Sequence, residues 1–500
     1  MDTLSLLVVV PLLTILVIMF MKSLKQIRLV AAVGMSIQLI QSGLVVWNYL
    51  AERKAGNMAE MLFTRDFVWY ESLNIHYAVG IDGISATLIG LTGVVVFAGV
   101  FASWTVDNLS KEFFMTLLLL ATGVFGFFIS LDLFTMFLFF EVAVIPMYLL
   151  IGIWGTGKKE YAAMKLTLML MGGSALILVA LLGLYFNSST TGDYTFNILE
   201  IAKVNIPIGE QRMFFPMAFV GFGVLGALFP FHTWSPDGHA SAPTAVSMLH
   251  AGVLMKLGGY GCLRVAIFLM PEAATEMSWI FLILASTGVI YGALGAVVQK
   301  DLKYINAYSS VSHCGLVLFG ILMLNKTASN GAVLQMISHG LMTALFFALI
   351  GMIYGRTKTR MVNEMQGLMK LWPFLGVCYV IAGLASLGLP GLSGFVAEMT
   401  IFVGAFQIDD MFHRVITVIA ISSIVVAAVY ILRVVGKMLM GPTDNEAELK
   451  DFPDATWYEK LSVVALIIPI VAMGVAPLWL SDTVMESIEP IIQRLTAINF

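Results

Sequence analysis

Three ionisable side chains lie inside long apolar stretches of the sequence, where a charge is costly. Glu141 lies near the centre of LFTMFLFFEVAVIPMYLL, Lys256 lies in HAGVLMKLGGYG, and Glu398 lies in SLGLPGLSGFVAEMTIF. Burial disfavours the charged form of an acid or a base, and a nearby opposite charge restores it. A Glu and a Lys in one apolar bundle can therefore gain and lose protons as they pair and separate, which suits a proton relay. The alternative is a purely structural ion pair.

Two histidines and a second lysine extend this pattern. His313 in SSVSHCG and His339 in QMISHGL lie between Lys256 and Glu398 in sequence, which favours a relay, although a lone helix histidine is usually structural. Lys165 lies close to the start of another apolar stretch. There it either extends toward the membrane interface or takes part in proton uptake.

Three more candidates lie at helix starts and breaks. His232 lies in the polar turn PFHTWSPDGH, which interrupts an apolar helix at Pro230. Freed backbone groups persist in lipid only where they face protein or water, so this turn marks either a transport path or a kinked helix with a water-exposed loop. Lys303 lies at a helix start, where ordinary surface charge is equally expected. His250 precedes Lys256 by six residues, so the two share no helix face, but they can line one cavity.

The composition is that of a polytopic membrane protein. Of the 500 residues, 59% are hydrophobic and 12% are charged, against roughly 25% charged in soluble domains. The net charge is −4 without a basic or acidic block, so nothing indicates a nucleic-acid partner. The three cysteines are isolated in apolar runs without metal or iron–sulfur spacing, and no glycine-rich nucleotide motif occurs. We therefore expect no cofactor or metal in this chain.

Fourteen apolar stretches are long enough to cross a membrane, since a span needs about 20 apolar residues. They lie at 3–20, 28–49, 83–104, 113–130, 132–154, 161–186, 213–231, 243–268, 278–299, 304–324, 331–354, 372–408, 414–439 and 461–480. The twelfth is too long for one helix, and we expect it to break at Pro390. The sequence therefore predicts an all-α membrane protein with broken helices 7 and 12.

The breaks also predict an internal repeat. Spans 4–8 and 9–13 are two sets of five helices that run in opposite senses, and the fourth helix of each set is broken. Paired breaks in inverted halves indicate a transport path at mid-membrane. The predicted units are residues 1–112 with an outer hairpin, 113–268 and 278–439 as the two repeats, and 440–500 with span 14 and a surface helix.

The distribution of basic residues predicts the orientation. The loops on one side carry 16 Lys and Arg residues, and the opposite loops with the C-terminal tail carry 8. The positive-inside rule then places both termini on the periplasmic side of a bacterial inner membrane. On that outer side, VWYESLNIHYAVGIDG and DYTFNI predict strands or hairpins, and residues 484–495 predict an amphipathic helix. These elements either clasp a neighbouring subunit or cover loops of this chain.

Four motifs in fixed order carry a specific resemblance. PFHTWSPDGHASAPTAVSMLHAGVLMKLGGYG, DLKYINAYSSVSHCGLVLFG, QMISHGL and GLPGLSGFVAEM resemble the NuoM family of antiporter-like subunits of respiratory complex I, the proton-pumping NADH:quinone oxidoreductase. Mrp-type antiporters and membrane-bound hydrogenases share this fold. The resemblance implies a hetero-oligomer in the lipid bilayer, with antiporter-like neighbours on both sides. It also implies that FMN, iron–sulfur clusters and quinone are held by partner subunits.

The resemblance assigns roles to five residues. Glu141, Lys256 and Glu398 match the family's glutamate in span 5, lysine in span 8 and glutamate in span 12. His313 and His339 match histidines of its central polar axis. The implied path takes protons up near Lys165 and Lys256, passes them along the histidines and releases them through Glu398. The alternatives are a subunit that exchanges Na⁺ or K⁺ for H⁺, a membrane hydrogenase subunit, or a structural spacer that pumps nothing.

One position departs from the family. Its members usually carry a lysine five residues before the proline of the Pro-x-His step, and this chain has Leu225 there. Glu141 therefore lacks its usual partner, and an unpaired buried charge costs several kcal/mol. Either Lys256 or another residue reaches Glu141, or Glu141 stays neutral, or the first half serves only as a spacer. His250 is a candidate substitute proton carrier.

Overall fold

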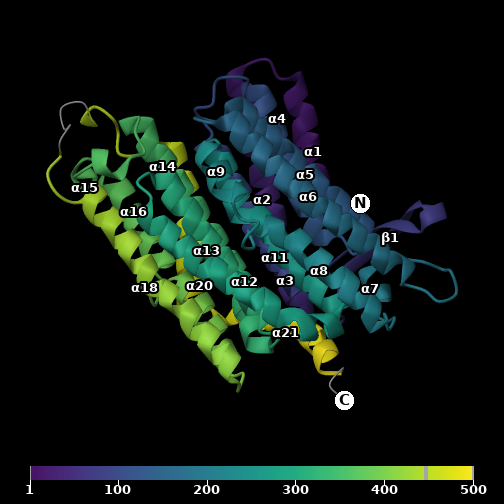
Figure 1. Ribbon diagram of the computed structural model, residues 1–500. Coiled ribbons are helices and arrows are strands. Elements are labelled where there is room, and N and C mark those ends of the chain that lie inside the picture. Colours follow the sequence, from purple (N-terminus) through teal and green to yellow (C-terminus); the bar gives the residue numbers. More distant parts are fainter. Residues whose placement is uncertain (1, 444–448, 498–500) are drawn as a thin grey trace.

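The computed structural model describes residues 2–443 and 449–497, and this part of the chain is a bundle of long helices (Figure 1). Residues 444–448 and 498–500 of the last predicted unit lie outside the described residues. Ten helices are long and apolar enough to cross a membrane. They are α2 (Leu24–Lys54), α3 (Gly83–Ala102), α4 (Ser110–Ile129), α5 (Leu133–Trp154), α6 (Lys159–Phe186), α12 (Pro271–Val298), α13 (Leu302–Leu322), α14 (Lys326–Thr357), α18 (Met411–Leu439) and α20 (Trp457–Val475).

The other predicted spans are shorter or interrupted helices. They are α1 (Ser5–Phe20), α8 (Ile208–Leu225), the pair α16 (Pro373–Ser386) and α17 (Ser393–Phe406), and the unbroken run of α10 (Thr244–Leu249), η2 (His250–Leu254), α11 (Met255–Gly261) and η3 (Cys262–Ile267). The predominantly helical, multi-span fold is therefore confirmed. The number fourteen stays a prediction, because the ten long helices alone meet the full length and hydropathy criteria among the described residues.

Both predicted breaks are present. α8 ends at Leu225 and α9 (Trp234–Ser241) follows, with Pro230 between them. α16 and α17 are separated by the turn that holds Pro390. Proline cannot donate the backbone hydrogen bond that a continuous helix needs. In the second turn Gly388 has φ +64°, a conformation that glycine adopts without steric cost.

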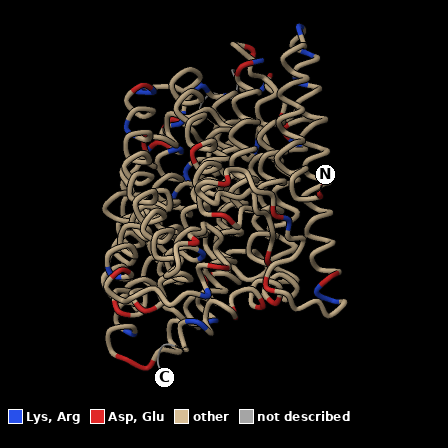
Figure 2. The backbone as a smooth tube through the Cα atoms, turned by 90° about the vertical axis from the view of Figure 1, so that its right-hand side faces the viewer, with Lys and Arg blue, Asp and Glu red and all other residues tan. Residues whose placement is uncertain are grey.

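α14 is the central helix of the bundle. It packs against α3, α10, α13, α16, α17, α20 and α21 (Leu478–Thr496), and almost all of its residues between Ala328 and Ile350 are buried. Elsewhere in the bundle, α4, α5, α6 and α8 pack against one another in chain order, and α12 packs against α13 and α18. Figure 2 shows charged residues at both ends of the bundle and also along its length. A polar side chain on α14 is therefore held away from lipid.

The predicted hairpin after α2 is confirmed. β1 (Leu62–Tyr70) pairs antiparallel with β2 (Ile75–Ile81) across the short turn η1 (Glu71–Leu73). DYTFNI, predicted as a short strand or hairpin, forms no hairpin of its own in the described part of the chain, and Asn197 makes an isolated antiparallel bridge with Asp132. The backbone of this segment pairs instead with the start of α5, where Leu133 N donates to Phe196 O at 2.9 Å and Ile198 N donates to Leu131 O at 2.9 Å. The segment then enters α7 (Ile198–Ile201).

The predicted amphipathic helix is α21, which runs across one end of the bundle (Figure 1). Val484 and Ile488 are fully buried, because the apolar face of α21 packs against α3, α12 and α14 of the same chain. This helix therefore covers the chain's own elements. The remaining short helices, η4 (Val362–Glu364) and α15 (Leu368–Leu371), lie in the connection between α14 and α16.

Candidate functional site

Four buried polar side chains form a line through the middle of the bundle, which we call the central line. Lys256 on α11, His339 on α14, His313 on α13 and Glu398 on α17 are each at most 7% exposed. Nζ of Lys256 lies 2.8 Å from Nδ1 of His339. The ring centroids of His339 and His313 are 5.3 Å apart. Nδ1 of His313 lies 3.5 Å from Oε1 of Glu398. The structure thus joins four residues that are up to 142 positions apart in the sequence.

The local helix geometry positions Lys256. The preceding turn, η2, is π-helical, and Lys256 donates a hydrogen bond from Nζ to the carbonyl oxygen of Ala251 within it. Such wide turns occur often at functional sites. On the next turn, a Cβ atom at Gly258 would lie 2.4 Å from the backbone nitrogen of Gly226. Glycine therefore allows the helix of Lys256 to approach the break after α8 closely.

Glu398 is positioned by the second break. It lies on the first turns of α17, and its Oε2 lies 2.7 Å from the place where a Cβ atom of Gly388 would stand. Gln335 Nε2 lies 3.0 Å from His313 Nδ1, so the same ring nitrogen faces both the amide and the carboxyl group. A proton on this imidazole is thus within reach of Glu398.

Lys165 and Lys303 lie at one end of the bundle, which we call the basic face because the Lys- and Arg-rich loops are there. Lys165 Nζ lies 2.8 Å from Oδ2 of Asp237 on α9, and Tyr304 donates a hydrogen bond to Oδ1 of Asp237 at 3.1 Å. Lys303 Nζ donates to the carbonyl oxygen of Ala242 at 2.5 Å. Sequence reasoning noted Asp237 only as part of the polar turn, and no sequence signal pointed to Tyr304.

His250 is brought close to a histidine that sequence reasoning did not select. The rings of His250 and His239 are fully buried with centroids 4.4 Å apart, and among the described residues their ring nitrogens have no hydrogen-bond partner. His232 lies elsewhere, stacked on Phe229 with centroids 5.4 Å apart and edge-on to Tyr291 with centroids 4.9 Å apart. Within the described part of the chain it makes no hydrogen bond to the central line.

Glu141 also lies off the central line. It is on α5, partly exposed, and its Oε1 is buried without a hydrogen-bond partner within residues 2–443 and 449–497. Leu225, the last residue of α8, is fully buried and supplies no charge. Lys256 is engaged by His339 and Ala251 instead. In this structure Glu141 therefore has no cation to pair with among the described residues.

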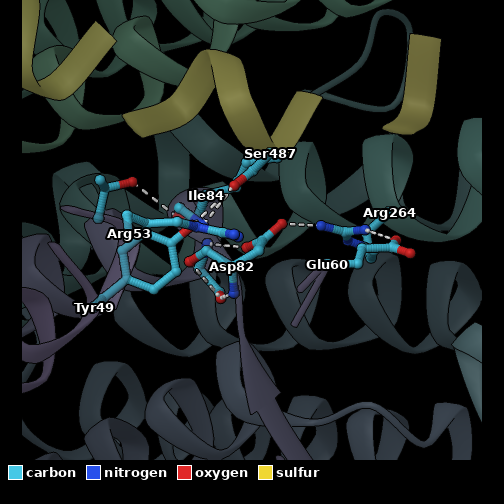
Figure 3. A network of polar contacts seen from close by, with 10 residues as sticks. Tyr49, Arg53, Glu60, Asp82, Ile84, Arg264 and Ser487 are labelled. Carbon is cyan, nitrogen blue, oxygen red and sulfur yellow. Dashed lines mark hydrogen bonds and ion pairs between the residues drawn. The ribbon is translucent and has the colours of Figure 1, made fainter. Parts of the chain in front are cut away.

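A second cluster of buried charge lies at the opposite end, beside the hairpin (Figure 3). Arg264 of η3 forms an ion pair with Asp82, the residue before α3, and their side chains are 2% and 1% exposed. Glu60 Oε1 lies 3.8 Å from Arg264 Nη1. Ser487 of α21 accepts a hydrogen bond from Gly83 N at 2.7 Å. This cluster ties η3 and α21 to the start of α3, and sequence reasoning assigned Arg264 no partner.

Comparison with known proteins shows which family this chain is similar to. The family described as "NADH:quinone oxidoreductase/Mrp antiporter, TM" matches residues 130–424. The chain is 35% identical over 445 residues to NADH-quinone oxidoreductase subunit M of Rhodobacter capsulatus, which covers 87% of this chain and 86% of the relative. It is 36% identical over 451 residues to NAD(P)H-quinone oxidoreductase chain 4 2 of Thermosynechococcus vestitus, with 89% and 83% covered.

Solved structures share the fold. A chain of respiratory complex I from Thermus thermophilus with bound NADH superposes with a TM-score of 0.89 at 24% identity, over 98% of this chain and 99% of that chain. A chain of the Mrp complex from Dietzia sp. superposes with a TM-score of 0.83 at 19% identity, over 98% of both chains. The helical architecture around the central line is therefore found in both kinds of assembly.

Proposed function

The chain belongs to the NADH:quinone oxidoreductase/Mrp antiporter family of transmembrane proteins, and from this membership we propose that it is a proton-translocating, antiporter-like subunit of the membrane arm of an NADH:quinone oxidoreductase. Two relatives that match over most of their length are a subunit of an NADH-quinone oxidoreductase and a chain of an NAD(P)H-quinone oxidoreductase. The chain then works in a hetero-oligomer with other membrane subunits. We assign FMN, iron–sulfur clusters and quinone to its partners and no cofactor to this chain.

The central line is the observation that carries the proposal. Lys256 and His339 are within hydrogen-bond distance, so Lys256 can donate a proton to a neutral imidazole. His313 and Glu398 are close enough for a second transfer after a small movement or through one water. Between the two rings, 5.3 Å apart, the proton needs a bridging water or a ring rotation. A change in the protonation of Lys256 therefore changes the electrostatic field at Glu398.

The energy for transport has to come from the partners. Moving one charge against 100 mV costs about 2.3 kcal/mol. The sequence contains no nucleotide motif that could supply this energy. We therefore infer that quinone reduction elsewhere in the enzyme drives the changes of protonation along the central line.

We further infer that the basic face is the cytoplasmic side of a bacterial inner membrane and that both termini are periplasmic, because positive residues are retained inside. Protons then reach Lys256 from the side of Lys165 and Asp237. His239 and His250 are suited to this step, because buried imidazoles without partners favour a bridging water. Lys303 holds α13 against the end of α9 beside this route.

The test is proton pumping by the intact enzyme in proteoliposomes, with quinone reduction measured in parallel. We expect Glu398→Gln to abolish or strongly reduce pumping. The matched control is Glu489→Gln on α21, whose side chain is 40% exposed and paired with Lys326. Normal pumping by Glu398→Gln and Glu141→Gln together would refute the proposal and leave a structural spacer.

The second candidate function is that the first repeat, residues 113–268, is a structural spacer while the second repeat pumps protons. The observation in its favour is that Glu141 has no cationic partner among the described residues while Leu225 occupies the usual lysine position. It predicts normal pumping in Glu141→Gln and loss in Glu398→Gln. Purification distinguishes a cation/proton antiporter from both of these candidates. Of the three, only an NADH:quinone oxidoreductase subunit purifies with flavin and iron–sulfur proteins.

A further inference from the structure

We propose that Glu398 exchanges protons with the basic face through a second polar path, which runs between α13, α16 and α18 and is centred on Tyr430. The path rests on the proposed function, because it supplies a proton to the carboxyl group at the end of the central line. It is separate from the route past Lys165 and Lys256. No residue of the path other than His313 and Glu398 belongs to the central line.

The path is a chain of polar contacts. From Glu398 it leads to His313, whose Nε2 lies 3.4 Å from Oγ of Ser386 in α16. Ser386 lines the same two small cavities as Tyr430 of α18. The Tyr430 hydroxyl lies 2.8 Å from Oγ of Ser309 in α13. Hydroxyl groups donate and accept at once, so each of these contacts can pass a proton onward.

Two small cavities lie on either side of Tyr430. The inner cavity, with a volume of about 10 Å³, is lined by His313, Ser386, Glu398, Ser423 and Tyr430 among others. The outer cavity, of about 20 Å³, shares Ser386 and Tyr430 and extends to Ser309 and Asn306. A water molecule needs about 10–15 Å³ and two to four polar partners, so each cavity has room for about one. His313 and Tyr430 are the titratable groups that line the inner cavity beside Glu398.

The outer cavity extends toward the basic face. Asn306 is one helical turn from Lys303 at the start of α13, and its buried Nδ2 has no partner among the described residues. An unsatisfied buried donor costs about 1–3 kcal/mol, so water is favoured there. On the facing helix, Val434 lines the cavity, and Arg433 donates from Nη2 to the carbonyl oxygen of Gln299 at 3.1 Å. These contacts place this end of α18 beside the loop between α12 and α13.

The path gives the second half of the protein its own proton supply. A proton can reach Glu398 from the basic face without crossing the first half. The replacement of the usual lysine by Leu225 then leaves the second half functional, because Glu398 does not depend on Glu141 or its missing partner. The central line would still pass protons between Lys256 and Glu398, and the path would add a supply from the basic face.

The experiment uses the whole enzyme in inverted membrane vesicles, where the basic face is in contact with the outer medium. Tyr430→Phe removes one hydroxyl group, and Ser309→Ala removes its partner. We expect the pumping rate of each variant at alkaline external pH to fall on the order of tenfold. Acidifying the outer medium should restore the rate, because proton arrival at Glu398 is then faster. The control Ser310→Ala, on the same helix and outside both cavities, should pump normally at every pH.

The outcomes separate the path from the proposed function. Wild-type pumping by Tyr430→Phe and Ser309→Ala at all pH values, with Glu398→Gln inactive, would overturn the path and leave the proposed function intact. A rate that falls equally at every pH would also overturn it, because the hydroxyl groups would then be merely structural. If Tyr430→Phe does not assemble, Ser309→Ala decides by the same pH profile. Normal pumping by Glu398→Gln would refute the proposed function itself.

Discussion

Asp82→Asn should destabilise the protein by leaving Arg264 as an unpaired buried charge. The substitution keeps the size of the side chain, and Asn caps a helix as well as Asp, so the bond from Ser85 N at 2.7 Å can persist. What is lost is the negative charge beside a guanidinium group that is 2% exposed. Breaking a buried ion pair from one side costs about 3–5 kcal/mol.

Glu60 reduces this cost only slightly. Its Oε1 lies 3.8 Å from Arg264 and its side chain is 38% exposed. Exposed ion pairs contribute about 0–1 kcal/mol. We therefore expect Asp82→Asn to lower the free energy of unfolding by about 3 kcal/mol, the lower end of the range. The assay is unfolding of the purified subunit in mixed micelles with SDS as denaturant.

Two further variants test the reasoning. In the double variant Asp82→Asn with Arg264→Met, the unpaired charge is gone, so most of the lost stability should return. Glu276→Gln breaks the ion pair of Glu276 with Arg212, whose side chains are 48% and 56% exposed, and should change the free energy of unfolding far less than Asp82→Asn does, because solvent screens this pair. Strictly additive effects of Asp82→Asn and Arg264→Met would refute the account, because they would show that the two charges do not interact.

Three other variants have expected outcomes. Gly388→Ala places a methyl group 2.7 Å from the Glu398 carboxyl at φ +64°, so pumping should fall while quinone reduction persists; unchanged pumping would show that the turn adjusts freely. Arg356→Lys loses the paired bonds to Glu459 at 2.9 and 2.7 Å, which join α14 to α20, and should lower the melting temperature of the enzyme. Ile488→Ala empties a fully buried site under α21 at a cost of about 2–5 kcal/mol, and proteolysis should then cleave α21 faster; protection equal to wild type would mean that partner subunits hold it.

The sequence by itself determined the membrane class, the helical character and the residues that form the central line. Lipid supplies no hydrogen bonds to the backbone, so each crossing has to be a long apolar helix that hydropathy reveals. The same cost makes Lys256 and Glu398 conspicuous, because an ionisable residue in such a helix stands out from its neighbours. Pro230 and Pro390 predicted the two breaks, because proline lacks the backbone N–H that a continuous helix needs.

The tertiary structure alone decided which of these groups meet. Asp237 pairs with Lys165 across 72 residues, and Tyr430 meets Ser309 across 121, so no local pattern could have joined them. The segment DYTFNI contains strand-forming residues, but its backbone hydrogen-bonds to the start of α5 and does not fold back on itself. Such contacts depend on the rotation and packing of whole helices, and these follow from the sum of many interactions between side chains far apart in the chain.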